Sequence, residues 1–321
     1  MADQKCALIT GASSGIGKEL TYLLARDGYS LILTALNKRK LEGFGMQVNE
    51  VYKVPVETIQ ADLSQETGAR KLFDEVRKRD LSVDVLINNA GVGLYGDFRD
   101  VDMDEYFQII NINIISFTHI AKLFVHDIIE KKGKILNTAS VASLQPGPHM
   151  SVYYASKAYD LSFSLALAEE LEPHGVTVTA LCPGPTETNF KIRARQEQTR
   201  AFQNKMLTME AREVAKTGYE AMKKGKRMVT AGTKNKVTLL LERLMSQKAI
   251  TKLSRLYLTE TGRLSSDKKE AREKMASKTE AHLEQGMKHD EPLKKKGDSQ
   301  PSESEAKRIE EAHKRERSEL R

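Results

Sequence analysis

Short apolar runs rich in β-branched residues recur along the first 230 residues, with helical patterns between them. A parallel sheet with crossover helices produces this alternation, because its strands are buried on both faces and need a long connection to the next strand. The pattern therefore predicts a single doubly wound α/β domain, with its ligand outside the carboxyl ends of the strands. The predicted strands are residues 6–9, 30–33, 56–60, 83–87, 134–137, 176–181 and 227–230.

The chain changes character after the last predicted strand. Residues 1–232 form the predicted domain, including a loop at about 189–210. Residues 233–260 are a basic amphipathic extension, in which leucines alternate with cations over a helix predicted at 237–258. Such a helix suits packing onto the domain or a second subunit, and an anionic membrane surface is the less favoured alternative.

The last 61 residues, 261–321, cannot bury a core, since half of them are charged and none is aromatic. We expect a charged tail that is partly helical or disordered, with helix-supporting charge pairs in 266–285 and 302–321.

The charge of +7 is spread evenly, because the tail carries 16 Lys and Arg against 14 Asp and Glu and residues 1–260 carry +5. This balance gives little support to a nucleic-acid partner. The only cysteines, Cys6 and Cys182, lie in apolar runs and suit buried thiols in a reducing compartment. A signal peptide has no room before residue 11, and no apolar run approaches the roughly 20 residues of a membrane span. We therefore expect a cytoplasmic protein.

Residues 10–17, Thr-Gly-Ala-Ser-Ser-Gly-Ile-Gly, follow the first predicted strand and open a helix. Glycines allow backbone angles and close approaches that a Cβ would block, while free N–H groups and the helix dipole favour an anion. The turn predicts a pyrophosphate site in a Rossmann-type domain, although the spacing Gly-x-x-x-Gly-x-Gly differs from the general dinucleotide fingerprint. The predicted contacts are Gly11, Ser13, Ser14, Gly15, Ile16 and Gly17.

Tyr153 and Lys157 lie four residues apart on a helix predicted to begin near residue 152, so their side chains project from one face. A nearby ammonium stabilises a phenolate and draws the tyrosine pKa down from about 10. Such a tyrosine can protonate a developing alkoxide, or deprotonate an alcohol in the reverse direction. An ordinary surface pair is the alternative interpretation of these two residues alone.

Taken together, the motifs resemble the short-chain dehydrogenase/reductase family over about residues 4–230. The closing stretch 224–236 is similar to a little-characterised bacterial-type branch of that family. The matches, in the family's order and spacing, are the turn at 10–17, Asp62-Leu63, Asn88-Asn89-Ala90-Gly91, Asn113, Ser140, Tyr153-Tyr-Ala-Ser-Lys157 and the segment 183–188.

The resemblance implies four catalytic residues. Tyr153 is the general acid/base, and Lys157 lowers its pKa and holds the nicotinamide ribose. Ser140 donates a hydrogen bond to the substrate oxygen, and Asn113 positions a water that relays protons. Asn113 is chosen over Asn111 because it lies 24 residues after Asn89 and 27 before Ser140.

The same resemblance to the family implies further cofactor contacts. Asp62 with Leu63 meets the adenine, and residues 89–91 line the adenine-ribose side, although Asn88 and Asn89 can instead tie strands together. The complete set outside the glycine turn is Lys38, Arg39, Asp62, Leu63, Asn89, Ala90, Gly91, Tyr153, Lys157, Pro183, Gly184, Thr186 and Thr188. No metal is expected.

The end of the second strand favours NADP(H) as the cofactor. NAD(H) stays open as the alternative. Ala35 stands where NAD-using members of the family carry an aspartate for the ribose hydroxyl. Lys38 or Arg39 can reach a 2′-phosphate, and solvated cations at a helix start are the alternative.

Substrate residues follow less directly. Phe190, Phe202, Met206 and Leu207 in the loop, with Leu94, Tyr95, Leu144, Gln145, His149 and Met150, predict a mainly apolar pocket for a small neutral carbonyl or alcohol. We expect a homo-oligomeric oxidoreductase, a dimer or tetramer. The alternatives are a non-catalytic cofactor-binding scaffold or sensor, and a reductase anchored at a membrane surface by 237–258.

Overall fold

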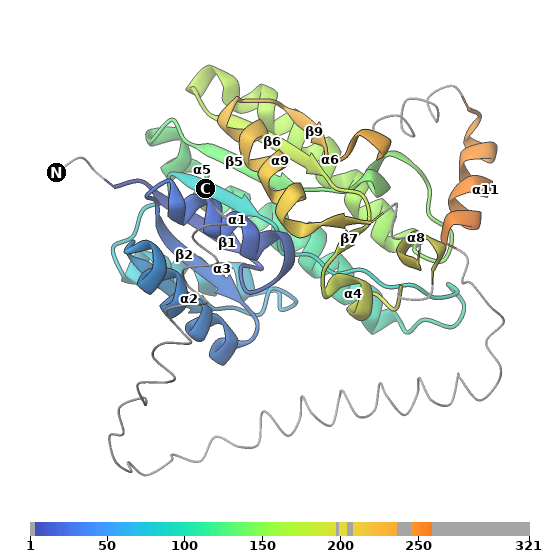
Figure 1. The fold of residues 1–321 in the computed structure, drawn as a ribbon, viewed down its shortest axis with the longest axis horizontal. Helices are drawn as coiled ribbons and strands as arrows, with labels where there is room; N and C mark the ends of the chain where they lie inside the picture. The colour runs from blue at the N-terminus through green and yellow to red at the C-terminus, as the bar shows by residue number, and fades with distance from the viewer. Residues whose placement is uncertain (1–3, 197–198, 204–207, 236–244, 259–321) are drawn as a thin grey trace, which may run out of the picture. The chain divides into compact units, whose positions relative to one another are not determined.

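The structure is a computed structural model that describes residues 4–196, 199–203, 208–235 and 245–258. Seven parallel strands form one sheet in the order β3-β2-β1-β4-β5-β6-β9, which confirms the predicted fold (Figure 1). All seven predicted runs are strands of this sheet: β1 Cys6–Thr10, β2 Ser30–Ala35, β3 Val56–Gln60, β4 Val85–Asn88, β5 Lys134–Thr138, β6 Thr177–Cys182 and β9 Met228–Thr230.

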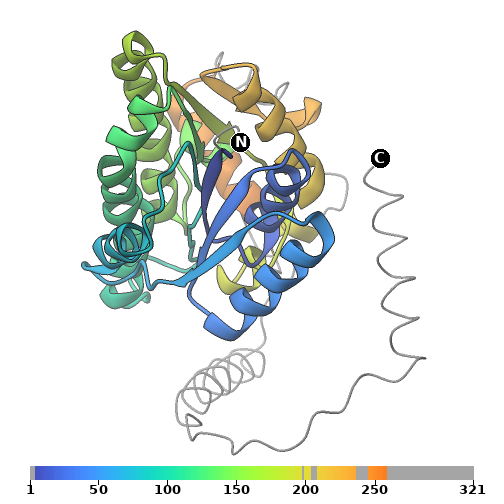
Figure 2. The same ribbon diagram turned by 90° about the vertical axis from the view of Figure 1, so that its left-hand side faces the viewer.

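Helices cover both faces of the sheet (Figure 2). One face is covered by α1 Gly15–Arg26, α2 Lys38–Tyr52 and α9 Ala211–Lys223, and the other by α3 Gly68–Lys78, α5 Phe117–Glu130 and α6 Ser151–Leu171. Each face has its own apolar core, because every residue of β1 and β4 is buried and successive side chains point to opposite sides. Cys6 and Cys182 are free, buried thiols, as expected.

The register of the strands brings polar residues together at one edge of the sheet. Thr10 pairs with Thr34 on β2, and Asn88 pairs with Asn137 on β5. Both pairs lie at or next to the carboxyl ends of their strands, where an open α/β sheet binds its ligand. The candidate side chains that follow these strands therefore gather at this edge.

One long helical stretch, Met103–Glu130, is apolar enough by length and composition to cross a membrane, which the sequence analysis did not foresee. It consists of α4 Met103–Ile110, the π-helix η1 Asn111–Ser116 and α5. Ile120, Phe124 and Ile128 of α5 are fully buried against the sheet. Such packing is that of a core helix in a doubly wound domain, which can pass the same test of length and composition.

Smaller elements complete the described chain. They are the 3-10 helices η2 Val141–Leu144 and η3 Glu172–His174, the short helices α7 Phe190–Arg193 and α8 Arg200–Gln203, and the two-stranded sheet of β7 Thr186–Glu187 with β8 Met209–Glu210. The sequence analysis predicted neither β7 nor β8.

The helix predicted over 237–258 is wrong in its extent. Residues 236–244 lie outside the described part, and α11 spans Gln247–Leu258. Met245 and Ser246 are not helical, because Ser246 acts as the N-cap of α11 and accepts a hydrogen bond from the N–H of Ala249 at 3.4 Å. The chain divides after Thr261, and the predicted tail 261–321 lies outside the described residues.

Candidate active site

The turn between β1 and α1 is built for an anion. Gly11 and Gly15 have φ of +66° and +56°, a region that L side chains rarely adopt. A Cβ at Gly17 would lie 2.5 Å from the carbonyl oxygen of Gly11 and from the amide of Asn89. Ser14 is the N-cap of α1, but its side chain makes no capping hydrogen bond. The backbone N–H groups of the first helical turn are therefore not taken by this side chain. Ser13, Ser14, Gly15 and Ile16 are all partly exposed there.

Asn89, Ala90 and Gly91 follow β4 and lie against the glycine turn. The N–H groups of Asn89 and Ala90 both donate to Thr10 Oγ1 at 2.8 Å, and the Asn89 amide donates to the Thr10 carbonyl at 3.0 Å. Asn89 Oδ1 also accepts a hydrogen bond from Thr138 on β5. The side chain of Asn89 therefore ties β1, β4 and β5 together, which is the alternative role that the sequence left open.

Two further predicted contacts lie at the edge of the sheet beyond β2 and β3. Asp62 follows β3, and its Oδ1 accepts hydrogen bonds from the N–H of Ser64 at 3.0 Å and the hydroxyl of Ser64 at 2.6 Å. Leu63 is buried, and its carbonyl is bound by Ser116. Asp62 is thus held in one orientation by the loop that it starts.

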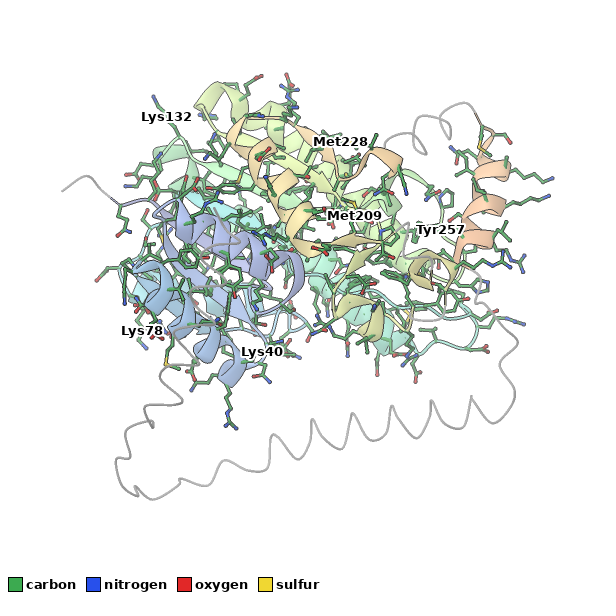
Figure 3. The ribbon with its side chains drawn as sticks, viewed as in Figure 1. Lys40, Lys78, Lys132, Met209, Met228 and Tyr257 are labelled. Atoms are coloured by element: carbon green, nitrogen blue, oxygen red, sulfur yellow. The ribbon has the colours of Figure 1, made fainter. Side chains whose placement is uncertain are left out.

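Lys38 and Arg39 begin α2 and are exposed. Lys40 lies in the same turn, also exposed on the outside of the domain (Figure 3). Within the described residues neither Lys38 nor Arg39 forms an ion pair that would fix its position. The chain after β2 therefore offers two exposed cationic side chains within four residues of Ala35.

The segment after β6 closes the other side of the glycine turn. A Cβ at Gly15 would lie 2.9 Å from the methyl group of Thr188, which places these two residues in contact. Pro183 accepts a hydrogen bond from the N–H of Val141, and Thr186 Oγ1 donates to the carbonyl of Gly184 at 2.8 Å. The predicted residues 183–188 therefore meet the predicted residues 11–17 in space.

Asn113 is fully buried in the π-helix η1. Its Oδ1 accepts from the N–H of Val92 at 3.0 Å, and its Nδ2 donates to the Val92 carbonyl and to Ser156 Oγ, both at 2.9 Å. A Cβ at Gly91 would lie 3.5 Å from Asn113 Oδ1 and 3.4 Å from Lys157 Nζ. Asn113 is therefore beside Lys157, whereas Asn111 binds the carbonyl of Ser64 in the loop after β3. A π-helix at this position is typical of functional sites.

Ser140 and Tyr153 lie next to each other and are hydrogen-bonded. Ser140 caps η2, where its Oγ accepts from the N–H of Ala142 at 3.1 Å, and it is hydrogen-bonded to Tyr153. Tyr153 is partly exposed, and its neighbour Tyr154 is buried against Ala142 and Met150. A Cβ at Gly147 would lie 2.3 Å from the Tyr154 ring, so Tyr154 is a packed core residue.

Lys157 is buried, and two partners hold its ammonium. Nζ donates to the carbonyl of Thr138 at the end of β5 and to Oδ2 of Asp160, both at 2.9 Å. Sequence analysis missed Asp160, although an aspartate three residues after Lys157 in an otherwise apolar stretch of helix is a readable signal. The carboxylate is fully buried, so it is an uncommon neighbour for a catalytic lysine.

These contacts change the electrostatics expected from the sequence. Burial raises the pKa of Tyr153 above 10, and the ammonium of Lys157 and the hydrogen bond with Ser140 lower it without overcoming burial. The negative charge of Asp160 adds to the rise. Burial lowers the pKa of Lys157, but Asp160 and Tyr153 together raise it further, so the net direction is a rise. Lys157 therefore lowers the pKa of Tyr153 in the expected direction, but the net direction is a rise, because burial has the larger effect.

The predicted substrate residues fall into two groups. Phe190 lies on Tyr153, with ring centroids 5.4 Å apart, and the rings of Tyr95 and His149 are 5.6 Å apart. Leu94 and Met150 are instead buried in apolar clusters, where they support the site from behind, while Leu144 is exposed. Gln145 and Phe202 are partly exposed, and Met206 and Leu207 lie outside the described residues.

Helix α11, the last one in the described part of the chain, reaches the same region. Its Leu258 is buried in one cluster with Ala142, Met150 and Tyr154, which Tyr153 also contacts. Tyr257 lies on α11, which packs beside α8 (Figure 3). The residues that close the site are therefore drawn from two segments about 100 positions apart in the chain.

A family described as short chain dehydrogenase matches residues 5–199 of this chain. The chain is 34% identical to the Bacillus subtilis oxidoreductase YvaG over 189 residues, which cover 57% of this chain and 69% of that protein. It is 35% identical to the Gallus gallus hydroxysteroid dehydrogenase-like protein 1 over 61% of this chain and 60% of that protein. The chain therefore spans between three fifths and about two thirds of these relatives.

Solved structures share the architecture. A short-chain dehydrogenase from Sphingobium yanoikuyae in complex with NADPH is 26% identical, with a TM-score of 0.66, and covers 82% of this chain and 99% of its own. A short chain dehydrogenase/reductase from Burkholderia phymatum in complex with NAD is 26% identical, with a TM-score of 0.68 over 82% of this chain and 98% of its own. A nicotinamide cofactor therefore suits the glycine turn and strand ends described above.

Proposed function

Because the chain belongs to the short chain dehydrogenase family, whose members are oxidoreductases, we propose that it is an NADPH-dependent reductase of a small neutral carbonyl compound. The reverse reaction is oxidation of the corresponding secondary alcohol. The observation that carries the proposal is the arrangement of Tyr153, which is hydrogen-bonded to Ser140 and faces the charge of the buried Lys157.

The nicotinamide, when bound, supplies the hydride in carbonyl reduction. Tyr153 donates its hydroxyl proton to the carbonyl oxygen as negative charge develops there. The Ser140 hydroxyl donates a hydrogen bond to the same oxygen, and both donors are held in place before the reaction begins. Lys157 then stabilises the phenolate that remains on Tyr153.

The raised pKa of Tyr153 sets a direction for the pH dependence. A phenol with a pKa above 10 is protonated throughout the neutral range, which is the form that carbonyl reduction needs. Alcohol oxidation needs the phenolate, so its rate should rise with pH well into the alkaline range. Asn113 lies beside Lys157, where a water held by it would return the proton to Tyr153 through Lys157.

The preference for NADPH is supported by the end of β2. Ala35 leaves no carboxylate to bind a ribose 2′-hydroxyl or to repel a 2′-phosphate. Lys38 and Arg39 are exposed in the first turn of α2, where the helix N-terminus adds to the attraction for a phosphate.

The test is oxidation of NADPH by the purified protein against a panel of ketones, aldehydes and quinones. Turnover that is lost in Tyr153→Phe and retained in Tyr154→Phe is expected. Calorimetric binding of NADPH without turnover of any compound would instead favour the non-catalytic scaffold or sensor.

We also propose that the protein is a cytoplasmic homo-oligomer. Met103, Phe107 and Ile115 along α4 and η1 are exposed, as are Tyr159 and Leu165 on the neighbouring α6. Single apolar residues on a surface are ordinary, but five on two packed helices suit a second copy of the chain. Light scattering should show a dimer or tetramer, and Phe107→Glu should lower the molar mass.

Membrane-surface attachment through α11 is the second candidate. Leu253 and Leu256 are exposed between Lys248, Lys252 and Arg255, the pattern of an interfacial helix. Ile250 and Leu258 on the same helix are buried, which favours packing on the domain. Flotation with anionic liposomes separates the two, since only the membrane role predicts that protein rises with the vesicles.

A further inference from the structure

We propose that Asp160 is a positioning residue for Lys157: it holds the ammonium together with the Thr138 carbonyl and shares its charge, so that Tyr153 stays a proton donor. The inference deepens the proposed function and rests on the roles given there to Tyr153 and Lys157. The Asp160 carboxylate accepts a hydrogen bond from Lys157 Nζ, so it acts through Lys157.

Asp160 lies where its carboxylate restricts the orientation of the Lys157 ammonium. Both residues are on α6, three positions apart and on one face, and their side chains are 0% and 6% exposed. An ammonium has three N–H donors. The Thr138 carbonyl and Asp160 Oδ2 take two of them at 2.9 Å each, which leaves one for the side of Tyr153 and the cofactor. The direction of the remaining donor is thereby determined.

An aspartate at position 160 is unfavourable for folding, because its carboxylate is buried. The cluster beside it, Ala139, Leu161, Ala180 and Cys182, is apolar. Its Oδ1 is buried and has no hydrogen-bond partner in the part of the chain that the structure describes. Burying a carboxylate with an unsatisfied oxygen lowers the free energy of unfolding, unless the attraction to its partner offsets the loss of hydration. An apolar side chain would satisfy the core better, so packing alone does not account for an aspartate here.

The charge of Asp160 affects the pKa of Tyr153, and both residues interact with Lys157. Asp160 raises the pKa of Tyr153, whereas Lys157 lowers it. Burial raises the pKa of the Asp160 carboxyl itself to about 6, although Lys157 pulls it downward. Among the described residues, the titratable groups that face this pair are Tyr153 on α6 and Cys182 on β6. Burial raises the pKa of the Cys182 thiol to about 12, so it stays neutral.

The consequence is a change in the site near pH 6. Above this pH Asp160 is ionised and neutralises part of the Lys157 charge, which keeps Tyr153 protonated. Below it Asp160 is neutral, and Lys157 acts on Tyr153 with its full charge. In the unmodified enzyme the rate of carbonyl reduction should therefore fall across about pH 6 as pH rises, because Tyr153 becomes a weaker acid.

The main test is Asp160→Asn, which keeps the size and the Oδ1 acceptor and removes the charge. We expect the rising limb of kcat/KM for alcohol oxidation to move to lower pH by about one unit, the effect of one nearby charge. The break near pH 6 in reduction should vanish. Asp160→Glu, which keeps the charge, should retain both features. The control is Asp127→Asn, which removes another buried carboxylate, paired with Arg77 at the opposite edge of the sheet.

A second readout does not need activity. The ultraviolet absorbance of tyrosinate, measured with and without Tyr153→Phe, gives the ionisation of Tyr153 directly, and its midpoint should fall in Asp160→Asn. Asp160→Ser serves as the neutral variant if Asp160→Asn does not fold, as judged by circular dichroism. If neither neutral variant folds, the break near pH 6 in the unmodified enzyme decides.

Unchanged pH limbs and an unchanged tyrosinate midpoint in a folded neutral variant, or a missing break near pH 6 in the unmodified enzyme, would overturn the proposal for Asp160. The proposed reductase function fails separately, when no compound is reduced although tyrosinate titration still reports the shift.

Discussion

The two ends of this site are held in very different ways. At the catalytic end, Ser140, Lys157 and Asn113 are buried, and each makes hydrogen bonds to neighbouring backbone or side-chain groups. At the end of β2, Lys38 and Arg39 are exposed and have no ion-pair partner among the described residues. Burial is the reason for the difference, because a buried polar group must find partners and an exposed cation can remain solvated.

The contrast teaches which properties a fold determines. Chemistry at Tyr153 depends on positions that the strands and α6 impose. Cofactor preference depends on flexible side chains that gain only modest electrostatic energy near solvent. We therefore expect substitutions at the catalytic end to act on turnover steeply, and those at the end of β2 to act on affinity gently. Four measurements break or sharpen this comparison.

Tyr153→Phe should have the largest effect. It removes the proton donor and leaves the ring packed against Phe190, so turnover should fall by at least about 10²-fold while cofactor affinity is retained. Lys157→Ala should lower both, since one ammonium serves the phenol and the cofactor. Steady-state kinetics and calorimetry measure the two quantities. A larger loss in Tyr154→Phe than in Tyr153→Phe would show that the wrong tyrosine has been chosen.

Gly17→Ala should come next, because the added Cβ would lie 2.5 Å from a backbone oxygen. The turn must shift, which should weaken cofactor binding at least about tenfold and destabilise the fold by about 1–3 kcal/mol. Gly43→Ala is the matched control, since nothing lies within 4 Å of its Cβ position in α2. That variant should bind cofactor normally and gain about 0.5–1 kcal/mol in stability. Equal behaviour of the two variants in calorimetry would argue against a cofactor at the glycine turn.

Ala35→Asp tests the exposed end of the site. The new carboxylate should repel a 2′-phosphate and accept a hydrogen bond from a ribose hydroxyl, so the preference should change from NADPH to NADH by about tenfold, or about 1.4 kcal/mol. Met46→Asp adds the same charge on an exposed part of α2 and should leave the preference unchanged. Tighter binding of NADH than NADPH to the unmodified protein would contradict the assignment.

Removal of the tail should have the smallest effect. A chain ending at Thr261 should keep its melting temperature and turn over within about twofold of the full chain, because residues 262–321 have no aromatic side chain and their exposed charge pairs contribute a few tenths of a kcal/mol each. A chain ending at Ser246 is the comparison. It also loses Ile250 and Leu258, whose burial is worth about 1.5–3 kcal/mol each. A several-fold change in turnover or a new subunit count in the longer chain would show that the tail is structural.

Sequence alone predicted the seven strands because each is a short run rich in apolar or β-branched residues between helical patterns, even where charged or polar residues interrupt it as in β3. The strands β7 and β8 have two residues each, too few to produce any periodicity. The start of α11 was missed because leucines before and after Ser246 continue one amphipathic pattern, and only the cap interrupts it.

The site shows the same division. The spacing of Tyr153 and Lys157 placed these two side chains on one helix face, and the resemblance to the family added Asn113 and Ser140 to the same neighbourhood. The pKa of Tyr153 depends on how far burial outweighs a charge, and the partner of Lys157 depends on side-chain direction inside a core. Neither the pKa of Tyr153 nor the partner of Lys157 can be deduced from the order of the residues alone. The spacing of Asp160 from Lys157 marks it as a possible partner, but the contact itself depends on how α6 packs against β5.

The position of Leu258 has a consequence for where variation can act. The family model matches residues 5–199, whereas Leu258 packs with Met150 and Tyr154, in the cluster that Tyr153 also contacts. A segment outside the matched range therefore forms part of the surroundings of Tyr153. Substitutions in α11 can change the shape of these surroundings while Ser140, Tyr153 and Lys157 keep their positions.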